Sequence, residues 1–315
     1  MAITEATAYL DNPNYNEFWL QDQSVIEDRL ATRRQNSPLE FLAEEEIPPM
    51  LADLFPRGPG AWVVTKHADI LEMSKNPQIY SSAQGITLRD AGAEANEFFS
   101  SMIGMDDPRH ARMRKIVSAG FTPRMLKKLE DSVAVQASEI IDDICEKGEV
   151  DFVVDVAAAL PLKIVCDLMG IPGERYNEVF DHTNVILGAA DPEYVDNPMD
   201  IMTSVLTSGG ALAQIMNEVA ASKVGAETDD LTTKLVNAEL DGEKLTESEL
   251  ASFFILLVVA GNETTRNAIS WGMKYLTDNP DQRAIWENDF ETVAPKAVEE
   301  IVRLASPVTL SLIHI

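Results

Sequence analysis

Basic side chains are scarce in this sequence of 315 residues. Lysine and arginine number 25 against 52 aspartates and glutamates, which gives a formal net charge of −27 at pH 7. A charge of this sign and size repels phosphate backbones and anionic membrane surfaces. We therefore do not expect a nucleic acid as a partner. Solubility or a salty habitat is the simpler explanation of the acidic excess, because net charge bears on colloidal behaviour and not on fold.

Cysteines and long apolar runs are also rare. The two cysteines, Cys145 and Cys166, have neither CxxC nor Cys/His spacing, so the sequence predicts no disulfide framework and no zinc site. The most apolar run, 253–260, is far shorter than the roughly 20 residues that cross a bilayer, and we interpret it as a buried helix rather than a membrane span. The N-terminus has no basic stretch followed by an apolar one, so no secretory signal is recognisable and a cytoplasmic location is expected.

Helical patterns dominate the chain. Residues 61–65 are the best strand candidate and follow a turn rich in proline and glycine. Residues 81–105 are dotted with glycine and read as a loop suited to lining a pocket, whereas apolar residues recur at helical spacing over 126–144 and 156–169. Neither a repeat nor an interdomain linker is visible. We therefore predict a single domain over residues 1–315, mainly α with a small β component.

The longest predicted helix has an unusual middle. Thr246-Glu-Ser-Glu249 matches a capping box, and nothing breaks the helical pattern for about 30 residues, until Pro280. The centre of this helix reads Ala-Gly-Asn-Glu-Thr-Thr over 260–265. A glycine inside a helix costs about 0.5–1 kcal/mol relative to alanine, and a buried Glu or Thr needs hydrogen-bond partners. Such a run therefore needs a compensating reason.

Two interpretations of this run stay open. The missing side chains at Ala260 and Gly261 leave room for a large group to approach the helix, while Glu263 and Thr264 can pass protons or hold a water. Alternatively, the run is a solvent-facing polar turn where the helix leaves the core. Periodicity alone favours neither.

Two basic side chains are predicted to share a helix face. Pro108 suits a helix start, and His110 and Arg114 stand four residues apart, so both point the same way. Their N–H groups suit a carboxylate or phosphate of a ligand, although a solvated basic face explains them too. The whole segment 109–128 carries arginines and lysines but no acidic residue. In so acidic a chain, this predicts a patch that meets an anion, an acidic partner protein, or both.

An acidic and a basic residue stand three apart near the end of the sequence, in Glu300-Ile-Val-Arg303. Ion pairs at this spacing are common on helices, and most are exposed and weak. Taken alone, the motif is most simply an ordinary surface pair.

In this order, the three patterns together resemble the signature of the cytochrome P450 family. AGNETT at 260–265 is similar to the oxygen-activation run of the family's central helix, the pair at 110 and 114 to its HxxxR element, and 300–303 to its ExxR element. The resemblance covers nearly the whole chain. It implies the cytochrome P450 fold and a haem-thiolate monooxygenase that inserts one oxygen atom from O2 into an apolar substrate, such as a sterol, a terpenoid or a fatty chain.

The resemblance also implies how the cofactor and partners would be bound. His110 and Arg114 would bind the propionates of haem b, iron protoporphyrin IX, and Ala260 and Gly261 would lie over the porphyrin. An acidic ferredoxin-type protein would supply electrons and dock on the basic segment 109–128.

The catalytic roles implied by the family fall on Glu263 and Thr264, which would deliver the protons that dioxygen activation requires. Glu300 and Arg303 would be structural and would brace the haem-binding core.

The sequence departs from the family pattern at its end. In the family, a glycine-rich loop with the haem-ligating cysteine follows the ExxR element, but this chain ends shortly after Arg303. Neither Cys145 nor Cys166 has such a loop, so we expect no axial thiolate and no metal ligand in this chain. We interpret it as incomplete at the C-terminus, with residues 311–315 outside the native family sequence.

Two functions therefore stay open. The first is a haem-thiolate monooxygenase, active in a full-length parent and not in this chain. The second is a truncated helical protein that keeps an apolar pocket and binds no iron. An unrelated acidic helical scaffold would require all three patterns to be coincidence. The candidate pocket-lining residues, each equally suited to an ordinary core, are Ile86, Leu88, Phe98, Phe99 and Val258.

Overall fold

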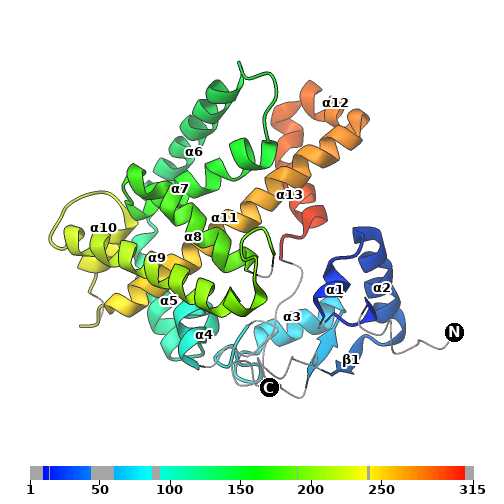
Figure 1. Ribbon diagram of the computed structural model, residues 1–315, viewed down its shortest axis with the longest axis horizontal. Helices are drawn as coiled ribbons and strands as arrows, with labels where there is room; N and C mark the ends of the chain where they lie inside the picture. The colour runs from blue at the N-terminus through cyan, green and yellow to red at the C-terminus, as the bar shows by residue number, and fades with distance from the viewer. Residues whose placement is uncertain are drawn as a thin grey trace. The chain divides into compact units, whose positions relative to one another are not determined.

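The computed structural model describes residues 10–13, 15–43, 60–86, 93–189, 191–239 and 242–308 (Figure 1). These residues belong to two compact units. The first contains the described residues up to Glu97 together with Ile103–Asp106, and the second contains Phe98–Met102 and the described residues from Asp107 onward.

The first unit carries a two-stranded antiparallel sheet. Its strands are β1 (Leu39–Leu42) and β2 (Ala61–Val64), so the strand predicted at 61–65 is confirmed. Phe41 lies opposite Trp62, and their ring centroids are 5.4 Å apart in an edge-to-face arrangement that favours this register. The helices of this unit are α1 (Asn16–Trp19), α2 (Gln23–Asn36) and α3 (His67–Lys75).

The second unit is helical. Its elements are α5 (Arg109–Gly120), α6 (Pro123–Ile144), the π-helical turn η4 (Val153–Ala157), α7 (Ala159–Met169), η5 (Gly173–Arg175), α8 (Tyr176–Gly188), η6 (Pro198–Asp200), α9 (Ile201–Lys223), α10 (Leu231–Asn237), α11 (Glu247–Asp278), α12 (Pro280–Asn288) and α13 (Phe290–Ala305). Helix α11 is the centre of this unit, because α7, α8, α9, α12, α13 and η4 all contact it (Figure 1).

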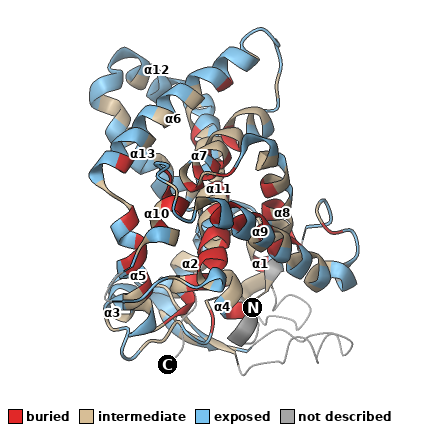
Figure 2. Ribbon diagram, turned by 90° about the vertical axis from the view of Figure 1, so that its left-hand side faces the viewer, coloured by how far each residue is buried: buried red, intermediate tan, exposed pale blue. Residues whose placement is uncertain are grey.

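Helix α11 begins as the sequence predicts. The Thr246 hydroxyl accepts a hydrogen bond from the backbone N–H of Glu249 at 3.1 Å, and the Glu249 carboxylate accepts one from the N–H of Thr246 at 2.9 Å. This capping box opens a helix of 32 residues. Its first half is the core of the unit, with every residue of 250–255 buried (Figure 2). By contrast, α12 and α13 bury none of their residues.

The structure differs from the sequence prediction at residues 81–105, which we expected to form a loop. The described part contains α4 (Ala93–Ser100) and the 3-10 turn η3 (Ser101–Gly104), and 87–92 lie outside the described residues. Tertiary contact accounts for the added helix, because the two phenylalanines of α4 pack against Gly209 of α9. No helix in the described part of the chain is long and apolar enough to cross a membrane.

Candidate active site

The unusual run in the middle of α11 stays fully helical. The helix continues for three more turns to Asp278, so the run is not a turn at which the helix ends. Ala260 is exposed, and Thr264 lies one turn further along the same face. The Thr264 hydroxyl donates a hydrogen bond to the backbone carbonyl of Ala260 at 2.6 Å. Its proton is thereby committed, while the lone pairs of its oxygen remain able to accept a hydrogen bond.

Gly261 has a packing reason of its own. A Cβ at this position would lie 3.0 Å from Cγ2 of Val165 on α7, closer than nearly all such contacts. The glycine therefore lets α7 approach α11. Its predicted contact with a cofactor stays a prediction, and the open face of the helix is formed by Ala260.

Asn262 is completely buried, yet its side-chain oxygen and nitrogen have no hydrogen-bond partner among the described residues. A buried polar group without a partner costs about 1–3 kcal/mol. Native structures tolerate such groups mainly where a ligand, a water or a functional constraint supplies the compensation. The middle of α11 therefore holds an amide whose hydrogen bonds a bound water or a ligand would have to supply.

Glu263 is held by its own helix and by α8. Arg266 forms an ion pair with its carboxylate, and Asn267 donates to Oε1 at 3.1 Å. Arg266 also donates to Oδ1 of Asn184 on α8 at 3.2 Å, so the network joins two helices. Although Glu263 and Thr264 are neighbours in sequence, the helix turns by about 100° between them.

The two predicted catalytic residues consequently face different cavities. Glu263 lines a polar cavity of about 270 Å³ together with Asn184, Asp191, Tyr194 and Arg266. Thr264 lines a separate cavity of about 500 Å³. A proton that passes from Glu263 to Thr264 must therefore cross between cavities, by a side-chain rotation or through water.

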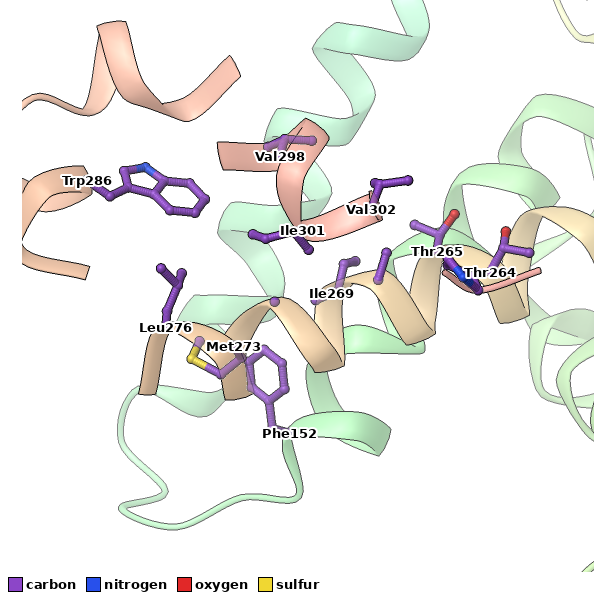
Figure 3. Close-up of a pocket in the computed structure, with 13 residues that line it drawn as sticks. Phe152, Thr264, Thr265, Ile269, Met273, Leu276, Trp286, Val298, Ile301 and Val302 are labelled. Carbon is purple, nitrogen blue, oxygen red and sulfur yellow. The ribbon is translucent and has the colours of Figure 1, made fainter. Parts of the chain in front are cut away.

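The larger cavity is apolar apart from its threonines, and it lies between the second half of α11 and helix α13 (Figure 3). It is lined by Phe152, Thr264, Thr265, Ala268, Ile269, Gly272, Met273, Leu276, Trp286, Val298, Ile301, Val302 and Pro307. This cavity was not predicted from the sequence, which suggested other lining residues. The helical spacing of 265, 269, 272 and 276 on α11 was the available signal.

His110 and Arg114 lie on α5, one turn apart as predicted. His110 is half-buried, with Nδ1 3.6 Å from the carboxylate of Asp107. Arg114 is exposed and forms no ion pair with any residue that the structure describes. An arginine without a carboxylate partner in so acidic a chain suits an anionic ligand group, such as a propionate.

Much of the remaining positive charge of segment 109–128 is already paired. Arg112 binds two glutamates, Lys127 lies 3.2 Å from both Glu130 and Asp131, and Lys128 lies 3.7 Å from Asp229. The basic patch is therefore weaker than the sequence indicates, because its charges are neutralised by acidic residues outside the segment.

Neither cysteine is suited to ligate iron. Cys166 is fully buried in α7, and burial together with the charge of Asp167 raises the pKa of its thiol to about 12, so it is protonated at neutral pH. Cys145 is exposed at the end of α6, where its Sγ donates to the carbonyl of Asp142 at 3.2 Å. Within the described ranges, no group of three or more His, Cys, Asp and Glu could hold a metal ion.

The Glu300–Arg303 motif forms a bidentate pair on α13, with both N–O distances at 2.7 Å. Both side chains are more than half exposed, at 54% and 66%. In this chain the pair has the geometry of a surface ion pair. The hydrogen bonds from Arg303 lower the pKa of Glu300.

Helix α11 with a polar run at its middle and helix α5 with His110 and Arg114 one turn apart define a helical protein suited to holding an anionic ligand. The comparisons identify the family. The family profile described as "Cytochrome P450" matches residues 61–314. The chain is 44% identical over 295 residues to a methyl-branched lipid omega-hydroxylase of Mycobacterium tuberculosis, which covers 93% of this chain and 67% of that protein.

Two further relatives indicate the same family. A steroid C26-monooxygenase of Mycolicibacterium smegmatis is 34% identical over 287 residues, covering 90% of this chain and 64% of that one. A solved cytochrome P450 of Mycobacterium marinum in complex with pseudoionone superposes with a TM-score of 0.83 at 37% identity, covering 91% and 68% of the two chains. This chain belongs to the cytochrome P450 family.

Membership confirms the predicted fold class, the monooxygenase class and haem b as the family's cofactor. The described residues fit part of that cofactor. Arg114 and His110 suit its propionates and Ala260 leaves a helix face open, whereas neither cysteine suits its iron.

Proposed function

We propose that the protein hydroxylates the terminal carbon of an extended apolar chain, of the methyl-branched lipid type, with a steroid side chain as the second candidate. The observation that carries this proposal is the 44% identity, over 93% of the chain, to a methyl-branched lipid omega-hydroxylase. The steroid C26-monooxygenase relatives support the same reaction, because omega and C26 both denote the end of an alkyl chain. A sterol, terpenoid or fatty-chain substrate was expected from the sequence.

The reaction converts R–H, O2, two electrons and two protons into R–OH and water. Haem b with a thiolate ligand supplies the dioxygen chemistry in this family. In the proposed arrangement, His110 donates an N–H to one propionate and the Arg114 guanidinium binds a carboxylate through its fork. Ala260 keeps the helix face open. Thr264 would accept a hydrogen bond from a water at Oγ1, and the Glu263 carboxylate would supply protons from the polar cavity.

The proposed electron donor is an acidic ferredoxin-type protein. Arg124 supports docking on segment 109–128, since it is exposed and forms no ion pair within the described part of the chain. The organisation of residues 1–315 as one domain and a cytoplasmic location stay predictions.

A second candidate function is a helical binding protein without iron. The fully buried, protonated thiol of Cys166 favours it, because this sulfur offers no thiolate. The apolar cavity of about 500 Å³ would then hold the ligand.

One experiment separates the two functions. The purified chain is titrated with haem, reduced and exposed to carbon monoxide, and the absorption spectrum reports the axial ligand. Haem uptake that weakens in Arg114→Gln and not in the matched Arg124→Gln supports the propionate site. A protein that takes up no haem but binds a methyl-branched fatty acid supports the second function.

The substrate class is tested with ¹⁸O2 on a haem-loaded full-length parent that carries the family's thiolate ligand. Mass spectrometry of methyl-branched, straight-chain and steroid substrates would show one ¹⁸O atom at the terminal carbon, most strongly for the methyl-branched chain. Oxygen inserted at an internal carbon would refute terminal hydroxylation.

A further inference from the structure

Arg112 lies between His110 and Arg114 in sequence but on the opposite side of α5. Two residues along a helix correspond to about 200° of rotation, so its guanidinium points away from the proposed propionate pair. It extends to the start of α11, where Nη1 donates to Oε1 of Glu249 at 2.7 Å and Nη2 donates to the carbonyl of Lys244 at 2.8 Å. Its Nε also forms an ion pair with Glu243. One side chain thus joins α5 to residues more than 130 positions away.

The Glu249 carboxylate accepts hydrogen bonds from two different parts of the chain. Oε2 of Glu249 accepts the backbone N–H of Thr246 in the capping box, while Oε1 accepts from Arg112. The carboxylate is only 16% exposed, so the contact is partly shielded from solvent. The residue that fixes where α11 begins therefore also fixes where α5 lies.

The guanidinium is well suited to this role. A planar fork with several donors can serve three acceptors in one geometry, which an ammonium on a flexible stem cannot do. Its hydrogen bonds to the carboxylates of Glu243 and Glu249 raise the pKa of Arg112 further, so the charge is present at every pH at which the protein folds. The other end of α5 is fixed by packing, because a Cβ on Gly120 would lie 2.5 Å from Leu231 of α10.

We propose that Arg112 is a positioning residue for haem: by anchoring α5 to the capping box of α11, it sets His110 and Arg114 relative to the open face of α11. This rests on the proposed role of His110 and Arg114. Arg112 itself touches no cofactor. Its effect is geometric, since it holds two helices that carry different parts of one site.

The chain offers a close control. Arg175 also binds two glutamates, Glu178 at 2.6 Å and Glu218 at 2.9 Å, and its side chain is 30% exposed against 31% for Arg112. It lies in η5 and joins that turn to α8 and α9. Arg175→Gln therefore removes a comparable ion-pair network from another part of the unit.

Two measurements test the proposal on the full chain. Hydrogen exchange, without haem, should show faster exchange across α5 and the first turn of α11 in Arg112→Gln and not in Arg175→Gln. In the haem-loaded protein, transfer of haem to a competing acceptor should be about fivefold faster for Arg112→Gln and unchanged for Arg175→Gln, since the effect reaches the haem only through the position of α5. Unchanged exchange in α5 would overturn the proposal, whereas wild-type retention of haem by Arg114→Gln would overturn the propionate site instead.

Two further variants separate geometry from charge. Glu249→Gln removes a negative charge, which by electrostatics alone would slow the loss of an anionic haem. Glutamine still completes a capping box, so the start of α11 is kept. Positioning predicts the opposite sign, with faster loss. Arg112→Lys keeps the charge and loses the fork, and we expect it to behave like Arg112→Gln; wild-type retention by Arg112→Lys would refute positioning.

Discussion

Asp230 is the buried charge whose removal should cost this protein most. Asp230 is only 8% exposed. It caps α10, because its Oδ1 accepts a hydrogen bond from the backbone N–H of Thr233 at 2.7 Å. Oδ2 accepts from Nζ of Lys223 at 2.8 Å and from the hydroxyl of Thr228 at 2.7 Å. Gly170 lies directly over this carboxylate, because a Cβ there would be 2.8 Å from its carbon.

Two losses combine in Asp230→Ala. Removing an N-cap costs about 1 kcal/mol. Breaking a largely buried ion pair leaves Lys223 without its counter-charge and costs about 3 kcal/mol at the lower end of such cases. Because these effects share one side chain and partly overlap, we expect a decrease of about 3 kcal/mol in the free energy of unfolding. Asp230→Asn keeps the cap and should cost about half as much.

Urea unfolding followed by circular dichroism measures both losses. The matched control is Asp229→Ala, since Asp229 is the preceding residue and forms only exposed pairs with Lys234 at 3.1 Å and Lys128 at 3.7 Å. Its midpoint should stay close to that of the wild type. Equal losses for Asp229→Ala and Asp230→Ala would refute the reasoning, because burial is the feature that distinguishes the two carboxylates.

The pH dependence of the Asp230 contribution has a definite sign. Burial alone raises the pKa of this carboxyl group, but the hydrogen bonds from Lys223, Thr233 and Thr228 outweigh it, so the pKa lies below its usual value. A lowered folded-state pKa contributes stability above the unfolded-state value of about 3.9, and this is lost as the pH falls through the folded-state pKa. The stability difference between wild type and Asp230→Asn should therefore shrink below about pH 4.

Three further predictions follow from single positions. Gly209→Ala should destabilise the protein by about 1–3 kcal/mol, because its Cβ would lie 2.8 Å from the phenylalanine rings of α4. A Cβ at Gly210 has no atom within 4 Å, so Gly210→Ala should stabilise the protein by about 0.5–1 kcal/mol. Thermal unfolding measures both, and equal shifts for the two variants would contradict this. Cys145 should react with a thiol reagent in the native chain while Cys166 reacts only after unfolding, as mass spectrometry of the labelled peptides would show. Thr264→Ala in a haem-loaded full-length parent should lower product formed per electron pair by about tenfold, and unchanged coupling would exclude a role of this hydroxyl in proton delivery.

The sequence determined those features that depend on local chemistry. The capping box at Thr246 fixes the start of α11, since the hydrogen bonds involved span only three residues. The run 260–265, His110 with Arg114, and 300–303 were sufficient together to indicate the family that the comparisons confirm. Each of these signals lies within one or two turns of helix, where residue spacing alone defines geometry.

The tertiary structure decided whatever depends on residues distant in sequence. Gly261 is small because Val165 of α7 approaches it, and Arg112 is neutralised by Glu249 of α11 and by Glu243, which precedes that helix. Neighbouring residues Glu263 and Thr264 face separate cavities, because each cavity is completed by other helices. A pattern of spacing gives the direction of a side chain on its own helix, but packing between helices determines what that side chain meets.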